Sequence, residues 1–118
     1  MITNKAAKYL WDARYAAERV IKFIADRSYD EYVADEMVSA AVERQFEIIG
    51  EALVRLRRTA PDVSAMIPDV SEIIGFRNVL VHDYENLDFR RVWVTIKDDI
   101  PKLISTLTEL LRQAPPLE

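Results

Sequence analysis

Apolar residues recur at alternating steps of three and four along three long segments of the chain, and this spacing constrains the fold more than any other feature. It places the apolar side chains on one stripe of an α-helix, and such a stripe is buried against neighbouring helices. The two glycines, Gly50 and Gly75, both fall inside periodic segments, so the turns of a β-rich fold are disfavoured. The sequence therefore predicts an all-α protein.

Chain breakers and capping residues divide these stripes into separate helices. Residues 28–31 contain Ser and Asp, which favour turns, and are expected to connect the first two long helices. Asp69 with Glu72 matches an acidic capping box, and Asp88 is expected to cap the last helix. Pro101 is expected to kink or split that helix near residues 99–100. The expected helices cover residues 4–27, 32 or 35 to 58, a short segment from 61, 70 to about 82, and 88–110.

The length of 118 residues suits one domain with a single core. We expect an up-and-down bundle of four to five helices over residues 1–114, followed by a frayed tail at 115–118. Gly50 lies in the middle of a helix, where glycine costs about 1 kcal/mol relative to Ala. We therefore expect Gly50 to let another helix approach closely.

Composition excludes several classes of function. The chain has no Cys and one His, which excludes disulfides, cysteine nucleophiles, thiolate zinc sites and histidine clusters. Sixteen basic and twenty acidic side chains give a net charge of −4, so binding of nucleic acid by bulk positive charge is disfavoured, although a local basic patch is compatible with it. Neither a membrane-spanning run nor a secretory signal is visible, and we expect a cytoplasmic protein.

No metal or cofactor site is expected either. Glycine-rich loops that cradle phosphates or dinucleotides are absent from the sequence. The paired acids Asp35-Glu36 and Asp98-Asp99 point about 100° apart on a helix, so solvated faces are the better interpretation than metal ligands.

The one histidine, His82, lies five residues after Arg77 and two before Tyr84, with Asn78 beside the arginine. On a helix, Asn78 and His82 lie about 40° apart, whereas Arg77 and His82 diverge by about 140° with an axial rise of about 7.5 Å. Arg77 and His82 could converge in three ways: the helix loosens near His82, Arg77 reaches around it, or the two groups come from different chains of a dimer.

This set of residues suits phosphodiester cleavage without a metal. Histidine is the side chain that ordinarily titrates near neutrality, so His82 is the candidate for moving a proton. Arg77 can hold phosphate oxygens in a bidentate fork and offset charge in the transition state, while Asn78 can orient either group. Attack by the 2′-hydroxyl of RNA needs one group that takes a proton and another that supplies one. Because each chain has one His, our hypothesis is a two-fold homodimer that supplies both.

Spacing alone favours a structural interpretation of the same residues. A lone His at a helix end often caps the C-terminus, and a nearby Arg is often solvated or ion-paired. Tyr84 would then be a buried ring with a hydrogen-bonded hydroxyl.

The segment 77–84, Arg-Asn-Val-Leu-Val-His-Asp-Tyr, resembles the Arg-x4-His-x-Tyr signature of HepT-like proteins, toxins of the HEPN superfamily. The likeness extends in the same order to residues 49–52, to Ile67-Pro68 and to residues 88–93, and it covers nearly the whole chain. Asp69 stands where the family usually has an aromatic residue, which affects local packing and leaves the signature intact.

The resemblance implies a helical bundle that dimerises with its motifs facing a shared cleft and acts as a metal-independent ribonuclease without a cofactor. It implies that Arg77 and His82 are catalytic and that Asn78 supports them. It also implies a type VII toxin–antitoxin system, in which a minimal nucleotidyltransferase of the MntA type neutralises the toxin by transferring AMP to Tyr84. An AMP group there would add bulk and negative charge beside the catalytic pair and repel the RNA backbone.

Four further arginines are candidates for a basic rim that guides RNA: Arg55, Arg58, Arg90 and Arg91. Solvated cations at a helix end are the other interpretation, and it is the favoured one for residues 57–58.

The leading hypothesis is an RNA-cleaving toxin that works as a homodimer, with RNA and the nucleotidyltransferase as partners and with neither DNA nor membrane. One alternative is a non-catalytic helical binding module that docks the nucleotidyltransferase, and another is an oligomeric scaffold. The acidic balance favours the binding module over a broad RNA binder, whereas the intact set of Arg77, Asn78 and His82 favours the nuclease.

Overall fold

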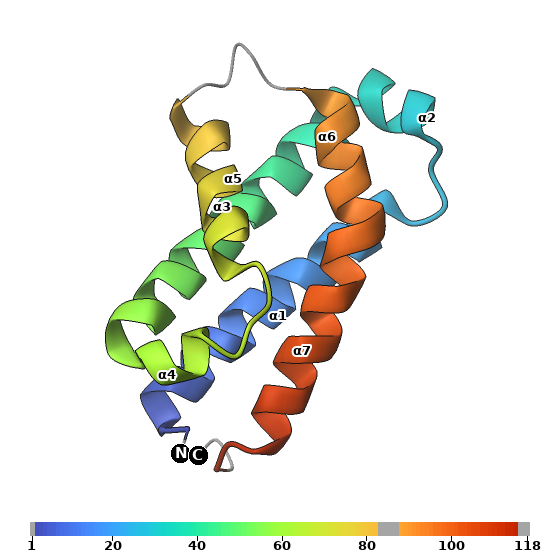
Figure 1. Ribbon diagram of the computed structural model, residues 1–118. Coiled ribbons are helices and arrows are strands. Elements are labelled where there is room, and N and C mark those ends of the chain that lie inside the picture. The colour runs from blue at the N-terminus through green and yellow to red at the C-terminus, as the bar shows by residue number, and fades with distance from the viewer. Residues whose placement is uncertain (1, 83–87, 116–118) are drawn as a thin grey trace.

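The computed structural model describes residues 2–82 and 88–115, and for residues 81 and 82 it describes the backbone alone. Within these ranges the chain is helical and contains no strand, which confirms the predicted all-α class (Figure 1). In chain order the elements are α1 (Asn4–Ile24), α2 (Tyr29–Ala34), α3 (Glu36–Thr59), α4 (Pro61–Ser64), α5 (Val70–His82), α6 (Phe89–Val94), the π-helical turn η2 (Thr95–Asp99) and α7 (Ile100–Arg112). None of the described helices is both long and apolar enough to cross a membrane.

The long members run alternately up and down the molecule, as Figure 1 shows for α1, α3, α5 and the continuous rod of α6, η2 and α7. α1 packs most extensively on α3 and also contacts α7, while α5 packs mainly on α3. α1 begins and α7 ends at the same end of the bundle. The expected up-and-down bundle is therefore confirmed, and α5 lies on the side of α3 that α1 leaves open.

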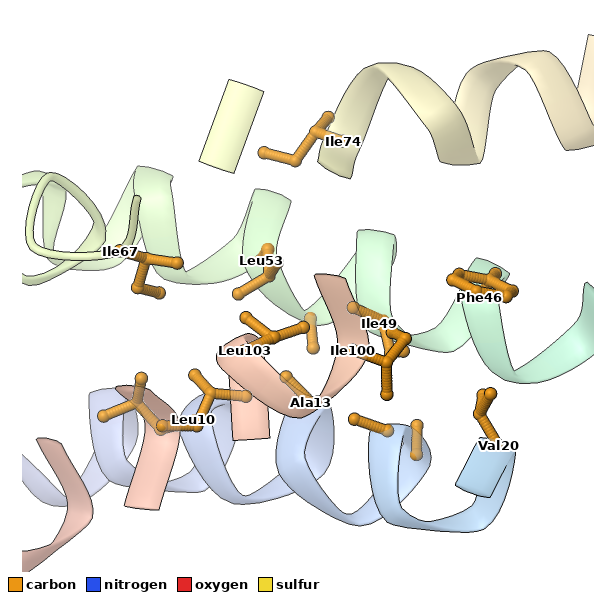
Figure 2. Packing of buried hydrophobic residues seen from close by; sticks show 14 of the residues in the cluster. Leu10, Ala13, Val20, Phe46, Ile49, Leu53, Ile67, Ile74, Ile100 and Leu103 are labelled. Carbon is orange, nitrogen blue, oxygen red and sulfur yellow. The ribbon is translucent and has the colours of Figure 1, made fainter. Parts of the chain in front are cut away.

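The apolar stripes form one core between the long helices. Small residues on α1 allow α3 and α7 to approach it closely, because Ala13 and Ala17 are fully buried. α1 and α3 pack directly on each other, and α7 packs on α1 beside them. In the view of Figure 2, Ile100 and Leu103 of α7 lie between Leu10 and Ala13 of α1 and Ile49 and Leu53 of α3, all in one core. The predicted stripe of α1 is confirmed, since Ala6, Leu10, Ala13, Ala17, Val20 and Ile24 are all buried.

The connection predicted at residues 28–31 is wrong, because a short helix, α2, begins there. The side chain of Ser28 accepts a hydrogen bond from the N–H of Glu31, and the Glu31 carboxylate accepts one from the N–H of Ser28. This reciprocal pair is a capping box. The two hydrogen bonds with Ser28 also lower the pKa of Glu31. α1 ends at Ile24, three residues before the expected residue 27.

The capping box predicted for Asp69 and Glu72 is also wrong. Asp69 has a left-handed φ of 59°, not the extended backbone of a capping residue. Its carbonyl still accepts the first helical hydrogen bond, from the N–H of Ile73. The predicted range of α5, residues 70–82, is nevertheless confirmed.

The last helix begins and splits as predicted. Asp88 caps α6, because its carboxylate accepts hydrogen bonds from the N–H groups of Arg90 and Arg91. Ahead of Pro101 the helix widens into η2, where the N–H of Ile100 reaches the carbonyl of Thr95. A proline ring displaces the carbonyl one turn earlier, and a π-helical turn accommodates that displacement without ending the rod.

Candidate active site around Arg77

α5 carries Arg77 and Asn78 in its middle and ends at His82. Because the helix is unbroken between Arg77 and His82, their Cα positions keep the divergence of about 140° that a regular helix gives. The side chain of His82 and the whole of Tyr84 lie outside the described residues. Their roles in catalysis and AMP acceptance stay predictions.

Gly50 of α3 makes room for the side chain of Arg77. A Cβ atom at Gly50 would overlap the Cβ and Cγ of Arg77 and would lie 3.2 Å from its Cδ. A Cβ atom at Gly75, by contrast, would meet no other atom within 4 Å. The close approach predicted for Gly50 is therefore confirmed, and the helix that approaches is the one with the motif.

The guanidinium of Arg77 is held at both of its terminal nitrogens. Nη1 donates a hydrogen bond to Oδ1 of Asn78 at 3.0 Å, and Nη2 lies 3.7 Å from Oε1 of Glu51 on α3. The Arg77 side chain is 26% exposed and that of Glu51 is 42% exposed, so solvent reaches the pair. Nε is buried and has no hydrogen-bond partner among the described residues. The terminal edge of the fork can therefore receive an anion, whereas the Nε edge is closed.

A buried acid, Glu43, lies on the same face of α3. Glu43 lies seven positions before Gly50. On a helix this spacing gives a rise of about 10 Å and an angular offset of about 20°. Glu43 is only 6% exposed, and its Oε2 has no hydrogen-bond partner in the described part of the chain. Burial, with a smaller contribution from the charge of Glu47, raises the pKa of Glu43.

The four arginines of the predicted basic rim do not gather in one place. Arg55 and Arg58 lie in the last two turns of α3, whereas Arg90 and Arg91 begin α6 at the other end of the bundle (Figure 1). The guanidinium of Arg90 stacks 3.8 Å from the ring centre of Tyr29, and that of Arg91 lies 5.9 Å from the ring centre of Phe76. A single chain thus presents two separate basic ends and no continuous rim.

Two hollows lie near this part of the molecule, and both are lined in part by residues of α3. A groove of about 200 Å³ runs between α1 and α3, and its lining includes Glu51, Arg55, Tyr15 and Arg19. A more apolar cavity of about 450 Å³ is lined by residues of α3, α5, α6, η2 and α7, Phe76 and Arg91 among them, but not by Arg77. The groove therefore adjoins Glu51, and Arg77 is in the lining of neither hollow. Across the described residues, no three acidic or histidine side chains gather as metal ligands.

The fold and the site define the class of protein broadly: a helical bundle in which a partly exposed arginine is held by an amide and a carboxylate. Comparison with known families narrows that class. The family model described as "Ribonuclease HepT-like" matches residues 14–110. The chain belongs to this HepT-like ribonuclease family.

Relatives of known name agree with the family. "Putative RNase MJ1380" of Methanocaldococcus jannaschii is 37% identical over 97 residues, which cover 80% of this chain and 86% of that protein. "Probable ribonuclease HepT" of Thermococcus cleftensis is 33% identical over 97 residues, which cover 80% of this chain and 86% of that protein. "Putative RNase TTE0752" of Caldanaerobacter subterraneus is 31% identical over 89% of this chain and 93% of that protein. No solved structure gives a significant match.

The sequence did not reveal the role of Glu51 in the site. Glu51 was visible as part of the segment 49–52 that resembles the family, but its contact with Arg77 depends on how α3 and α5 pack.

Proposed function

We propose that this protein is a metal-independent endoribonuclease. The observation that carries the proposal is the partly exposed side chain of Arg77, whose guanidinium is held by Asn78 and Glu51, in a chain of a ribonuclease family. An arginine whose guanidinium is held in place by its neighbours can bind the two non-bridging oxygens of a scissile phosphate and offset the negative charge that develops on them.

In the proposed reaction, the 2′-oxygen of RNA attacks the adjacent phosphorus while a neutral imidazole of His82 removes its proton. The bond between phosphorus and the 5′-oxygen breaks, and that oxygen takes a proton from an imidazolium. The products are a cyclic phosphate and a free 5′-hydroxyl, so the atoms balance without water or a metal. One proton is taken and one is supplied, which suits two histidines in opposite protonation states.

Those two histidines come from the two chains of a homodimer. In support, α5 is a regular helix through His82, and Arg77 is fixed against α3 at Gly50. Arg77 and His82 could converge by three routes, of which two lie within one chain: a loosened helix and an arginine that reaches around it. Both of these are therefore disfavoured. The remaining route is a cleft where the motifs of two chains meet.

We further propose that the protein is the toxin of a type VII toxin–antitoxin pair. A minimal nucleotidyltransferase would transfer AMP from ATP to the hydroxyl of Tyr84, with release of pyrophosphate. Co-expression with such a partner should add one or more adenylyl groups to the intact mass, and Tyr84→Phe should abolish the gain. An unchanged mass would refute this switch and leave the nuclease proposal intact.

The decisive experiment incubates the purified, unmodified protein with total RNA in excess chelator. Wild type should cleave the RNA, and both Arg77→Ala and His82→Ala should not. Arg44→Ala is the matched control, because Arg44 is an exposed arginine of α3 that pairs with Glu47 and should leave cleavage unchanged. Tight binding of the nucleotidyltransferase without any cleavage would favour the binding module instead.

A further inference from the structure

Three residues hold the side chain of Arg77, and none of them takes a chemical step in the proposed reaction. Asn78 belongs to the motif, whereas Gly50 and Glu51 come from α3. We propose that Glu51 is a positioning residue, which aims the guanidinium of Arg77 at the scissile phosphate, and that Gly50 provides the notch through which that side chain passes. This inference rests on the proposed ribonuclease function.

The notch fixes the lower part of the side chain. Because Gly50 has no side chain, the Cβ and Cγ of Arg77 occupy the space where a Cβ of α3 would otherwise lie. Any larger residue at position 50 would displace the base of the arginine, not merely its flexible end. The next residue of α3 is Glu51, so the arginine leaves the notch beside the carboxylate.

The carboxylate fixes the upper part through charge. At 3.7 Å, Oε1 of Glu51 is too far from Nη2 for a hydrogen bond but near enough to attract the guanidinium. The hydrogens of Nη2 therefore remain available for a phosphate oxygen. Asn78 uses one hydrogen of Nη1 and leaves the other, while the buried Nε is inaccessible to substrate. A phosphate can thus approach end-on, across Nη1 and Nη2.

Measurements of kcat, KM and stability distinguish a positioning role of Glu51 from two other roles that an acid could have at this place. A purely structural acid would change stability and leave kcat and KM unchanged. An acid that mainly repels the phosphate would, when neutralised, lower KM without lowering kcat. A positioning acid acts on the geometry of the transition state, so its loss lowers kcat.

Glu51→Gln keeps the shape of the side chain and removes its charge. We expect kcat for RNA cleavage to fall by about tenfold and KM to change by less than about threefold. Glu51→Asp, which keeps the charge on a shorter side chain, should recover part of the loss. Glu47→Gln is the matched control, because Glu47 lies one turn earlier on α3 and pairs with Arg44 at 3.1 Å, so it should leave kcat within about twofold of wild type. A Glu51→Gln variant with unchanged kcat would overturn the inference.

A second measurement does not depend on activity. The Nε–H of Arg77 is buried, so its ¹⁵N-resolved NMR signal should exchange slowly with solvent in wild type. Glu51→Gln should accelerate this exchange severalfold, and Glu47→Gln should not; Arg77→Lys identifies the signal by its disappearance. If wild type fails to cleave RNA, the proposed function fails, and this signal still decides whether Glu51 holds Arg77. An Arg77 signal that is identical in the Glu51→Gln variant would overturn the positioning role.

Discussion

The two glycines of this chain provide a matched pair of substitutions. Both lie inside helices, where Gly→Ala normally stabilises by about 1 kcal/mol because alanine restricts the unfolded chain and favours the helix. A Cβ at Gly75 has nothing within 4 Å, so Gly75→Ala should gain about 0.5–1 kcal/mol of stability. A Cβ at Gly50 would overlap the Cβ and Cγ of Arg77.

The overlap at Gly50 should reverse the sign of the effect. Overpacking of this kind costs about 1–3 kcal/mol, because a helix or a side chain must shift. Subtracting the helix gain of about 1 kcal/mol leaves a net loss of about 0–2 kcal/mol for Gly50→Ala. Because the gain from replacing a helical glycine is common to both variants and cancels, they should differ by the overpacking cost alone, about 1–3 kcal/mol in the free energy of unfolding.

Urea unfolding followed by circular dichroism measures this difference, with all proteins at one concentration so that any dimerisation contributes equally. RNA cleavage under native conditions should fall in Gly50→Ala and persist in Gly75→Ala. A Gly50→Ala variant that is as stable and as active as Gly75→Ala would refute the close packing of Arg77 on α3.

Two further substitutions test local energetics. Glu43→Gln should increase the free energy of unfolding at pH 7, because burial and the charge of Glu47 raise the pKa of Glu43 in the folded state and the ionised carboxyl is disfavoured there. The gain should shrink as the pH falls through the raised pKa of Glu43 and should vanish below the ordinary value of 4.5; a gain that grows in acid would contradict this reasoning. Asp88→Ala should cost about 1 kcal/mol of stability because α6 loses its cap. Asp88→Asn keeps an acceptor and should cost less; equal losses in thermal or urea unfolding would show that the cap is unimportant.

The helices themselves were largely predictable from local physics. The three-and-four spacing gave the stripe of α1, and Pro101 predicted the break at η2. Both errors in the predicted helix starts concern the capping box, which forms at Ser28 and not at Asp69. Ser28 and Glu31 form the capping box that starts α2, whereas Asp69, directly after Pro68, adopts a left-handed backbone and forms none. Residue identity alone does not reveal the backbone angle on which a cap depends.

The partners of the site were harder to predict because they are set by packing between helices. Gly50 indicated that some helix approaches α3, but only the register of α5 shows that Arg77 lies there and meets Glu51. The four arginines proposed for a basic rim lie at two ends of the bundle, and even those that are neighbours in sequence diverge. Arg90 and Arg91 point about 100° apart on α6, and their guanidinium groups lie over different rings, those of Tyr29 and Phe76.

The same packing leads to a test of how the active site is completed. Arg77 is anchored on α3, α5 stays helical to His82, and the sequence contains one histidine, so each chain supplies one imidazole for two proton transfers. If a shared cleft needs the histidine of both chains, a mixed dimer of wild type with His82→Ala contains no intact cleft. Differently tagged chains allow that dimer to be purified, with a doubly tagged wild-type dimer as the control. Its cleavage rate should approach that of the His82→Ala homodimer. Half the wild-type rate, which is full activity for each wild-type chain, would mean that every chain carries a complete site and that dimerisation serves another purpose.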